Sequence, residues 1–199
     1  MAIRDARAET SFITGNFTMQ PTALPQRYDA IARSLHWASA ILIVAAFVMG
    51  LTIDLLPREW RPPYLNAHVL AGLAIVLIAI VRLGWRAGHP APQAPAGSTA
   101  LAELMIKVGH AALYVMMLVV PVIGFAPLFA RGRGINFGLF QIASPIERTK
   151  DWIKPTTEIH EIAAWALIAL AVGHVAAAIY HQAVLKDGVL LRMMPEKQA

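Results

Sequence analysis

The chain has 199 residues, of which 57% are hydrophobic and only 15% are charged. Soluble domains carry about 25% charged residues, so this composition excludes a soluble fold and indicates a membrane protein. The chain has no cysteine, which excludes disulfides, iron-sulfur clusters and haem attached through thiols. The net charge of +5 does not indicate nucleic-acid binding, because basic residues at membrane-helix ends usually meet phospholipid headgroups.

The first 26 residues contain no apolar run long enough for a signal-peptide core. Their Thr, Gly and Pro content predicts a flexible extension, to which we assign no function. Residues 27–199 are predicted to form one membrane domain.

Four long apolar runs follow the extension, and each approaches the twenty or so residues that a helix needs to cross a bilayer. They are Ser34–Ile53, Pro62–Val81, the stretch between Lys107 and Arg131, and the stretch between Glu161 and Lys186. None alternates with the period of two that barrel strands require. The sequence therefore predicts an all-α membrane protein, a four-helix transmembrane up-and-down bundle.

The connections between these runs are short, so both termini should lie on one side of the membrane. Ala87–Ser98 is rich in proline and is predicted to be a loop. Arg131–His160 is the longest predicted loop, and Asp151 and Trp152 are expected to begin a short surface helix within it. The distribution of Arg and Lys favours termini on the cytoplasmic side.

The histidines fall at two depths if the helices alternate in direction. His36, His110 and His174 lie toward the inner side, and His68 and His160 lie toward the outer side. His160 and His174 are fourteen residues apart on one helix, which gives about 21 Å of rise and a net rotation of only about 40°. Both rings should therefore face the bundle interior.

A single histidine in a membrane helix is often only a hydrogen-bonded packing residue. Here, however, His36 and His174 share one depth and His68 and His160 share the other, and each pair comes from different helices. Paired imidazoles on facing helices are what six-coordinate haem iron needs, with the macrocycle filling the bundle core. The sequence thus predicts two stacked haem sites.

Three further residues lie fourteen positions after a histidine, on about the same face at the opposite depth. Gly50 follows His36, Gly124 follows His110 and Arg82 follows His68. The glycines would leave room for a flat porphyrin, although glycine in membrane helices also serves helix packing. Arg82 could bind a haem propionate, or it could extend to the headgroups.

Two other uses of the histidines are less well supported. Zinc sites usually gather three or four ligands at one depth, often with a thiolate or carboxylate, and no acidic residue lies in the middle of these helices. A haem-free transporter that uses the histidines as a proton relay remains open, but it does not explain their pairing.

Several motifs give the chain a family resemblance from Gln26 to its end. They are RYDAIARSLHW at the first helix, NAHVLAGL in the second, GHAALYVMMLVVPVIGF in the third, IHE at His160 and GHVAAAIYHQAVLKDGVLLRMMP after it. Together they resemble bacterial cytochrome b561. The resemblance implies a multi-pass inner-membrane protein with two haem b groups, ligated by His36 with His174 and by His68 with His160. It also implies superoxide oxidase activity, in which electrons pass from superoxide to ubiquinone.

The remaining candidates concern the two substrates. The resemblance places His181 near bound quinone, as a hydrogen-bond donor and proton route, and we expect His110 to contact quinone or a propionate. Basic residues of the outer loops could attract the superoxide anion: Arg58, Arg61, Arg131, Arg133 and Lys150. Such residues more often anchor a protein to headgroups.

A second function stays open at this point. The chain could be a membrane-anchor cytochrome b subunit that passes electrons between quinone and a soluble dehydrogenase or hydrogenase. Such a subunit should present a larger docking surface than these loops provide. We therefore expect the lipid bilayer, quinone and superoxide as partners, with no obligatory soluble protein.

Overall fold

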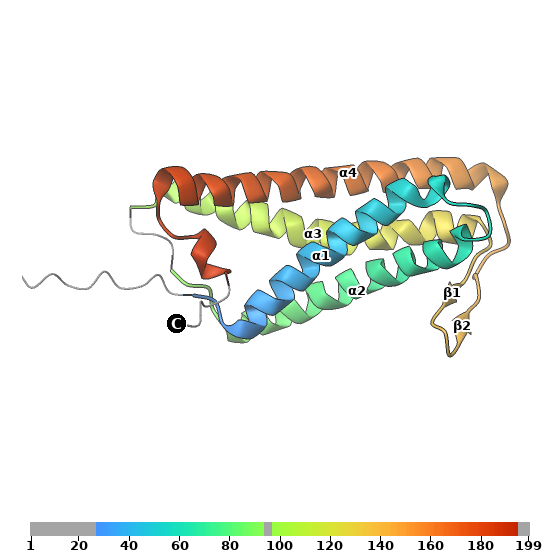
Figure 1. Ribbon diagram of the computed structural model, residues 1–199, viewed down its shortest axis with the longest axis horizontal. Coiled ribbons are helices and arrows are strands. Elements are labelled where there is room, and N and C mark those ends of the chain that lie inside the picture. The colour runs from blue at the N-terminus through green and yellow to red at the C-terminus, as the bar shows by residue number, and fades with distance from the viewer. Residues whose placement is uncertain (1–26, 94–96, 195–199) are drawn as a thin grey trace, which may run out of the picture.

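The computed structural model describes residues 27–93 and 97–194, and the predicted N-terminal extension lies outside them. Four long helices run side by side (Figure 1): α1 (Ala30–Thr52), α2 (Arg61–Gly88), α3 (Ala100–Ala130) and α4 (Lys150–Tyr180). Each is long and apolar enough to cross a membrane. The predicted four-helix up-and-down bundle is confirmed. We call the end of the bundle at which α1 begins and α4 ends the terminal end, and the opposite end the hairpin end (Figure 1).

The connection between α3 and α4 differs from the prediction. The loop expected to reach His160 stops at Thr149, and Asp151 and Trp152 form the first turn of α4 instead of a separate helix. No glycine interrupts this stretch, Asp151 suits the positive end of the helix dipole, and Lys154 pairs with Glu158 one turn later at 3.7 Å. Pro155 removes one backbone hydrogen bond without ending the helix. At the other end of the bundle, α2 continues to Gly88, two residues into the predicted loop.

A small β-hairpin occupies the shortened connection, and the sequence analysis did not predict it. Strands β1 (Ile135–Asn136) and β2 (Gln141–Ile142) pair antiparallel, with Ile135 opposite Ile142. Glycine is required at its base, because a Cβ on Gly134 would lie 2.1 Å from the carbonyl oxygen of Ile142. Gly138 turns the chain at φ +85°.

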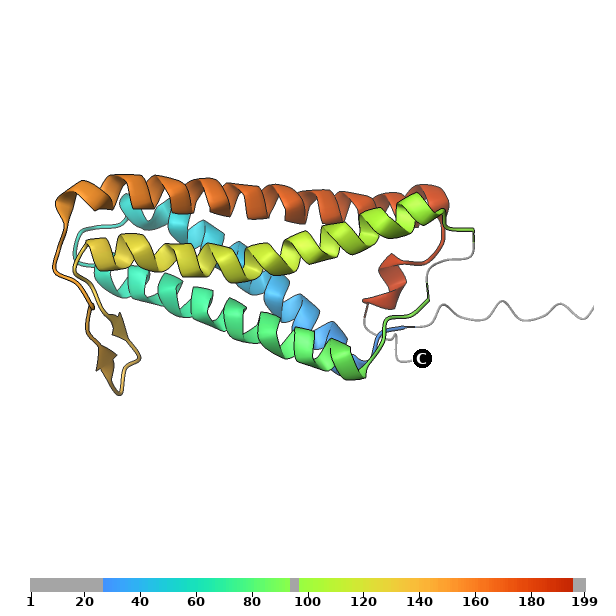
Figure 2. The same ribbon diagram turned by 180° about the vertical axis from the view of Figure 1, so that it is seen from behind.

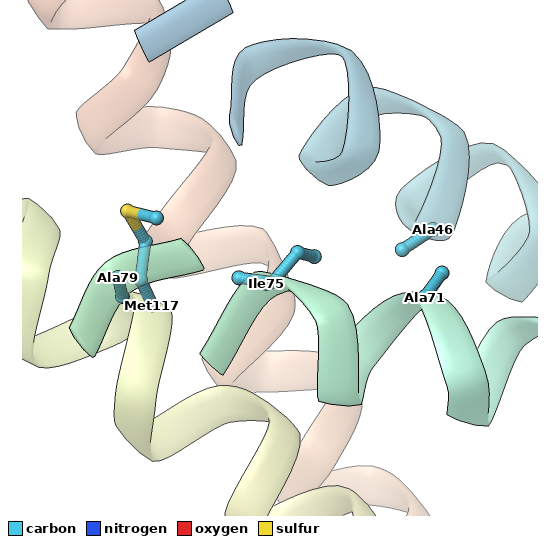
Figure 3. Packing of buried hydrophobic residues seen from close by; sticks show 5 residues of the cluster. All are labelled: Ala46, Ala71, Ile75, Ala79 and Met117. Atoms are coloured by element: carbon cyan, nitrogen blue, oxygen red, sulfur yellow. The ribbon is translucent and has the colours of Figure 1, made fainter. Parts of the chain in front are cut away.

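The centre of the bundle is packed by small and medium apolar side chains from α1, α2 and α3 (Figure 3). They are Ala46, Ala71, Ile75, Ala79 and Met117. Alanines at these positions let the helix backbones approach closely, which is the usual way to gain packing energy inside lipid. This core lies about midway between the two depths at which the histidines occur.

The helices associate as two pairs, α1 with α2 and α3 with α4, which are joined through α2 and α3. Helix α1 crosses the other helices obliquely (Figures 1 and 2). It meets α4 through Phe47 and Trp165, whose rings pack edge to face with centroids 4.9 Å apart.

The terminal end is closed by hydrogen bonds between segments distant in sequence. The Asp29 carboxylate accepts from the backbone N–H of Ala32 at the start of α1 and from Trp85 of α2, and these bonds lower the pKa of Asp29. After α4 the chain forms η2 (His181–Leu185), a π-helix, and then η3 (Leu190–Arg192). The Trp37 indole N–H donates to the carbonyl of Met193 at 2.9 Å. The C-terminal segment therefore lies across the terminal end of the bundle (Figure 1).

Candidate functional site

Two histidines from different helices face each other near the hairpin end. His68 of α2 and His160 of α4 are half-buried, with ring centroids 6.0 Å apart and ring planes at 89°. A cavity of about 60 Å³ adjoins both rings, and Gly72, Pro121 and Leu167 contribute to its wall. We call this pair the hairpin-side site.

Both rings of the hairpin-side site are anchored to a backbone carbonyl of a neighbouring helix. The Nδ1–H of His68 donates to the carbonyl of Ala46 on α1 at 2.9 Å, and the Nδ1–H of His160 donates to that of Val120 on α3 at 3.2 Å. A carbonyl can only accept, so these bonds place the proton of each neutral ring on Nδ1. Both Nε2 lone pairs remain free, as in histidines that bind a metal.

Gly50 and Gly124 make these two bonds accessible. Each lies one turn after the accepting carbonyl, Gly50 after Ala46 and Gly124 after Val120, where a side chain would partly cover that carbonyl. A Cβ on Gly124 would lie 3.0 Å from Cε1 of His160, and one on Gly50 would lie 3.5 Å from Cε1 of His68. The glycines therefore seat the histidine rings directly, a role that the sequence analysis did not assign to them.

Three more histidines gather near the terminal end. The rings of His36 and His174 have centroids 6.2 Å apart at 58°, and His110 lies 5.2 Å from His174. His110 is exposed, and its Nδ1–H donates to the carbonyl of Ile106 on its own helix. We call His36 and His174 the terminal-side site.

Arg82 lies against the terminal-side site, at the depth that the fourteen-residue spacing predicts. Its guanidinium donates to Nδ1 of His36 at 3.4 Å and to Oγ of the buried Ser39 at 3.2 Å, and it lies over the ring of Tyr114. Nδ1 of His36 is thus an acceptor, so the proton of the neutral ring is on Nε2. The two sites therefore differ in one ring: His36 of the terminal-side site carries its proton on Nε2, whereas both rings of the hairpin-side site carry theirs on Nδ1.

His181 is separate from both pairs and has a partner of its own. Its Nδ1 contacts Oδ2 of Asp187 at 2.5 Å, and the other oxygen of Asp187 accepts the backbone N–H of Val189. Both side chains are mostly buried. The π-helix η2 and the left-handed Lys186 turn the chain so that Asp187 comes back to His181.

The five basic residues predicted to attract superoxide differ in their surroundings. Arg61 pairs with Asp54 at 3.3 Å, while Arg58 and Lys150 are exposed. Arg131 donates to Thr157 of α4 at 3.0 Å, and burial followed by the charge of neighbouring Arg133 lowers the pKa of Arg131. Arg133 borders an open groove of about 660 Å³ beside the hairpin. Arg131, Arg133 and Arg148 form a positive group at the hairpin end.

The separation of the paired rings can be compared with what one iron requires. A metal-imidazole bond is about 2 Å long, and a ring nitrogen lies roughly 1.1 Å from the ring centroid, so two imidazoles on opposite sides of one iron have centroids about 6.2 Å apart. The observed 6.0 and 6.2 Å agree with that spacing. The two histidine pairs are therefore spaced so that each could hold a haem iron between its rings.

Some contacts of these sites were not foreseen from the sequence. The carbonyls that accept from the histidines are backbone groups, so no residue type in the sequence indicates them. Ser39 and Asp187 come next to Arg82 and His181 only in the folded chain. Across residues 27–93 and 97–194 no group of three or more metal-ligating side chains forms a metal site, so the zinc alternative gains no support.

Residues 27–196 match the family described as prokaryotic cytochrome b561. The chain belongs to this family. A cytochrome b561 is a membrane electron-transfer protein that binds haem b, so this chain is a multi-pass bacterial membrane protein with a redox role.

Three relatives illustrate the range of the family. The chain is 27% identical to cytochrome b561 homolog 2 of Escherichia coli, over 88% of this chain and 95% of the relative. It is 28% identical to the probable superoxide oxidase CybB of Yersinia pestis, over 87% and 98% respectively. It is 31% identical to cytochrome b562 of Cereibacter sphaeroides, over 84% and 94%.

The two seating glycines provide a matched test of the hairpin-side geometry. We expect Gly124→Ala to displace His160, because the new Cβ would be closer to the ring than ordinary contacts allow, and Gly50→Ala to be tolerated at its 3.5 Å contact. Reduced-minus-oxidised absorbance spectra of the purified variants should change for Gly124→Ala only. Equal spectra for both variants would contradict the seating role of Gly124.

Proposed function

We propose that the protein binds two haem b groups, one between His36 and His174 and one between His68 and His160. The ring separations support this assignment, and so do the Nδ1–H bonds that leave Nε2 of His68 and His160 free. When bound, haem supplies reversible one-electron transfer. The chain provides the ligands, holds them in orientation and surrounds them with a membrane-spanning helix bundle.

Arg82 has a specific part in this proposal. Coordination through Nε2 requires the proton of His36 on Nδ1, and this position now accepts a hydrogen bond from Arg82 at 3.4 Å. The guanidinium must therefore turn away from His36 on haem binding, and a propionate is the natural anion for it to meet. The bond to Ser39 and the ring of Tyr114 would keep it nearby.

The function that fits best is superoxide oxidation coupled to ubiquinone reduction. Two superoxide anions each lose one electron and become dioxygen, while one ubiquinone gains two electrons and two protons and becomes ubiquinol. The observation that carries this proposal is the positive group of Arg131, Arg133 and Arg148 beside the hairpin-side site. The name of the Yersinia pestis relative agrees with it.

The positive group is well placed to serve the hairpin-side site. Arg131 donates to Thr157, which lies three residues before His160 on the same helix. A cationic surface within about one helical turn of the site raises the local concentration and capture rate of a small anion. Arg58, Arg61 and Lys150 would add to this field, although Asp54 offsets Arg61 and Arg131, and Glu161 also offsets Arg131.

We place quinone at the terminal end, near His181 and His110. Asp187 holds the Nδ1 side of His181, so Nε2 can face a quinone carbonyl and deliver a proton. We also propose that the protein lies in the bacterial inner membrane with both termini in the cytoplasm. Protons for quinone reduction would then come from the cytoplasm, and superoxide would arrive from the other side. Residues 27–199 form the cytochrome domain in this scheme.

Haem stoichiometry tests the ligand assignment. We expect His68→Ala and His174→Ala each to lose one of two haems per chain, because the two sites share no ligand. Pyridine haemochrome absorbance against protein concentration provides the measurement. His89→Ala is the matched control, since His89 stacks on Trp85 outside both sites. Loss of haem from the control, or none from either site variant, would refute the assignment.

Stopped-flow absorbance tests whether superoxide is the electron donor. Superoxide alone should reduce the haems of the purified protein, and added ubiquinone should reoxidise them. Arg133→Gln should slow the superoxide step several-fold and weaken its dependence on salt, because a steering charge is lost. A wild-type protein that superoxide leaves oxidised would instead favour the membrane-anchor subunit.

Asp187 offers a test at the quinone end. Asp187→Asn retains an oxygen that accepts the Val189 N–H, but it presents an amide N–H to Nδ1 of His181. Nδ1 must then accept a hydrogen bond, so the proton of the neutral ring moves to Nε2. We expect kcat for quinone reduction to fall roughly tenfold or more while KM stays near its wild-type value. Asp187→Glu should restore part of the loss. An unchanged kcat with full haem content would show that Asp187 has only a structural role.

A further inference from the structure

The β1–β2 hairpin exposes an unusually apolar tip. Residues 134–146 carry no charged side chain. Leu139 is 98% exposed and Phe140 is 59% exposed, and the rings of Phe137 and Phe140 stack with centroids 4.8 Å apart. Large apolar side chains gathered on a surface indicate an interaction site.

The hairpin is a formed structure with a defined turn. The backbone N–H of Phe137 donates to the carbonyl of Phe140 at 2.9 Å, and the N–H of Gly138 donates to the side chain of Asn136 at 2.7 Å. Ile135, at its base, is buried. The tip therefore keeps its three apolar side chains together.

Asn66 fixes the depth at which the hairpin lies. Its side-chain amide donates to the carbonyl of Asn136 at 2.8 Å and accepts the N–H of Asn136 at 3.0 Å. Asn66 is the sixth residue of α2, so it lies roughly 8 Å from the start of that helix toward the bundle centre. The hairpin is thus held beside α2, at the level of its second turn.

The direction of the hairpin follows from this attachment. Figures 1 and 2 show it pointing sideways from the bundle, beyond the start of α2, and not along the bundle axis. The helices cross the membrane, so sideways is within the membrane plane. Trp60 is exposed just before α2, and tryptophan is enriched at membrane interfaces, so we expect the interface near Trp60 and Asn66 on its lipid side.

From these observations we infer that the tip of the β1–β2 hairpin, Phe137–Phe140, inserts among the phospholipids at the hairpin end and anchors this connection in the bilayer interface. Aromatic and aliphatic side chains are stable at that level, where headgroups meet acyl chains. The turn bonds and the Asn66 contacts satisfy polar groups of the hairpin backbone, as an apolar setting demands. Arg133 and Glu147 flank the uncharged segment, so the apolar stretch is limited to the hairpin and the residues directly after it.

A spin label provides the test, and the absence of cysteine makes the labelling site-specific. Leu139→Cys is labelled in the intact haem-loaded protein, which is then reconstituted into phosphatidylcholine and phosphatidylglycerol vesicles. Power-saturation electron paramagnetic resonance measures the accessibility of the label to oxygen, which concentrates in lipid, and to a water-soluble nickel chelate. Leu77→Cys, exposed in the middle of α2, is the lipid reference, and Glu147→Cys, exposed beyond the hairpin, is the aqueous reference.

We expect the label at position 139 to meet the nickel chelate several-fold less often than the label at position 147, with oxygen accessibility closer to that at position 77. Phe140→Cys should behave like Leu139→Cys, which guards against a local effect of one substitution. Labels at 139 and 140 that are as accessible to the chelate as the label at 147 would overturn the inference and leave the tip as a surface for a water-soluble protein. The result does not depend on which way the protein faces.

Discussion

The hydrogen bond from a histidine Nδ1–H to a carbonyl of a neighbouring helix is the interaction on which the centre of this protein depends. An imidazole in lipid is costly unless its nitrogens have partners. His68 and His160 each satisfy one nitrogen on the backbone and keep the other for a ligand. Because each acceptor belongs to a helix backbone and not to a mobile side chain, these bonds tie the ring positions to the positions of the helices.

The histidines of the terminal-side site have different neighbours. There the neighbour of His36 is the guanidinium of Arg82, a side chain that can turn, and a third imidazole lies close to His174. A positive charge beside one histidine pair and backbone carbonyls beside the other give the two pairs different electrostatic surroundings. If each pair holds a haem, as proposed, this difference would favour one direction of electron flow along the bundle.

Helix number, up-and-down order and membrane class followed from the sequence, because apolar length and charge placement in lipid leave few alternatives. The spacing of fourteen residues also brought Arg82 to the depth of His36. The start of α4 was missed because basic residues near Lys150 resemble a loop, whereas nothing there breaks a helix. The hairpin and the carbonyl acceptors were missed for another reason: strands of two residues and backbone atoms leave almost no pattern in a sequence.

The oblique path of α1 has a consequence for biogenesis. Since α1 pairs with α2 and α3 pairs with α4, while α1 and α4 have few contacts with each other, the chain can enter the bilayer as two successive helical hairpins. Each predicted haem takes one ligand from the first hairpin and one from the second. Haem binding would then add a second connection to the α2–α3 packing, so in cells short of haem the two halves should be held together less firmly and be more open to proteases.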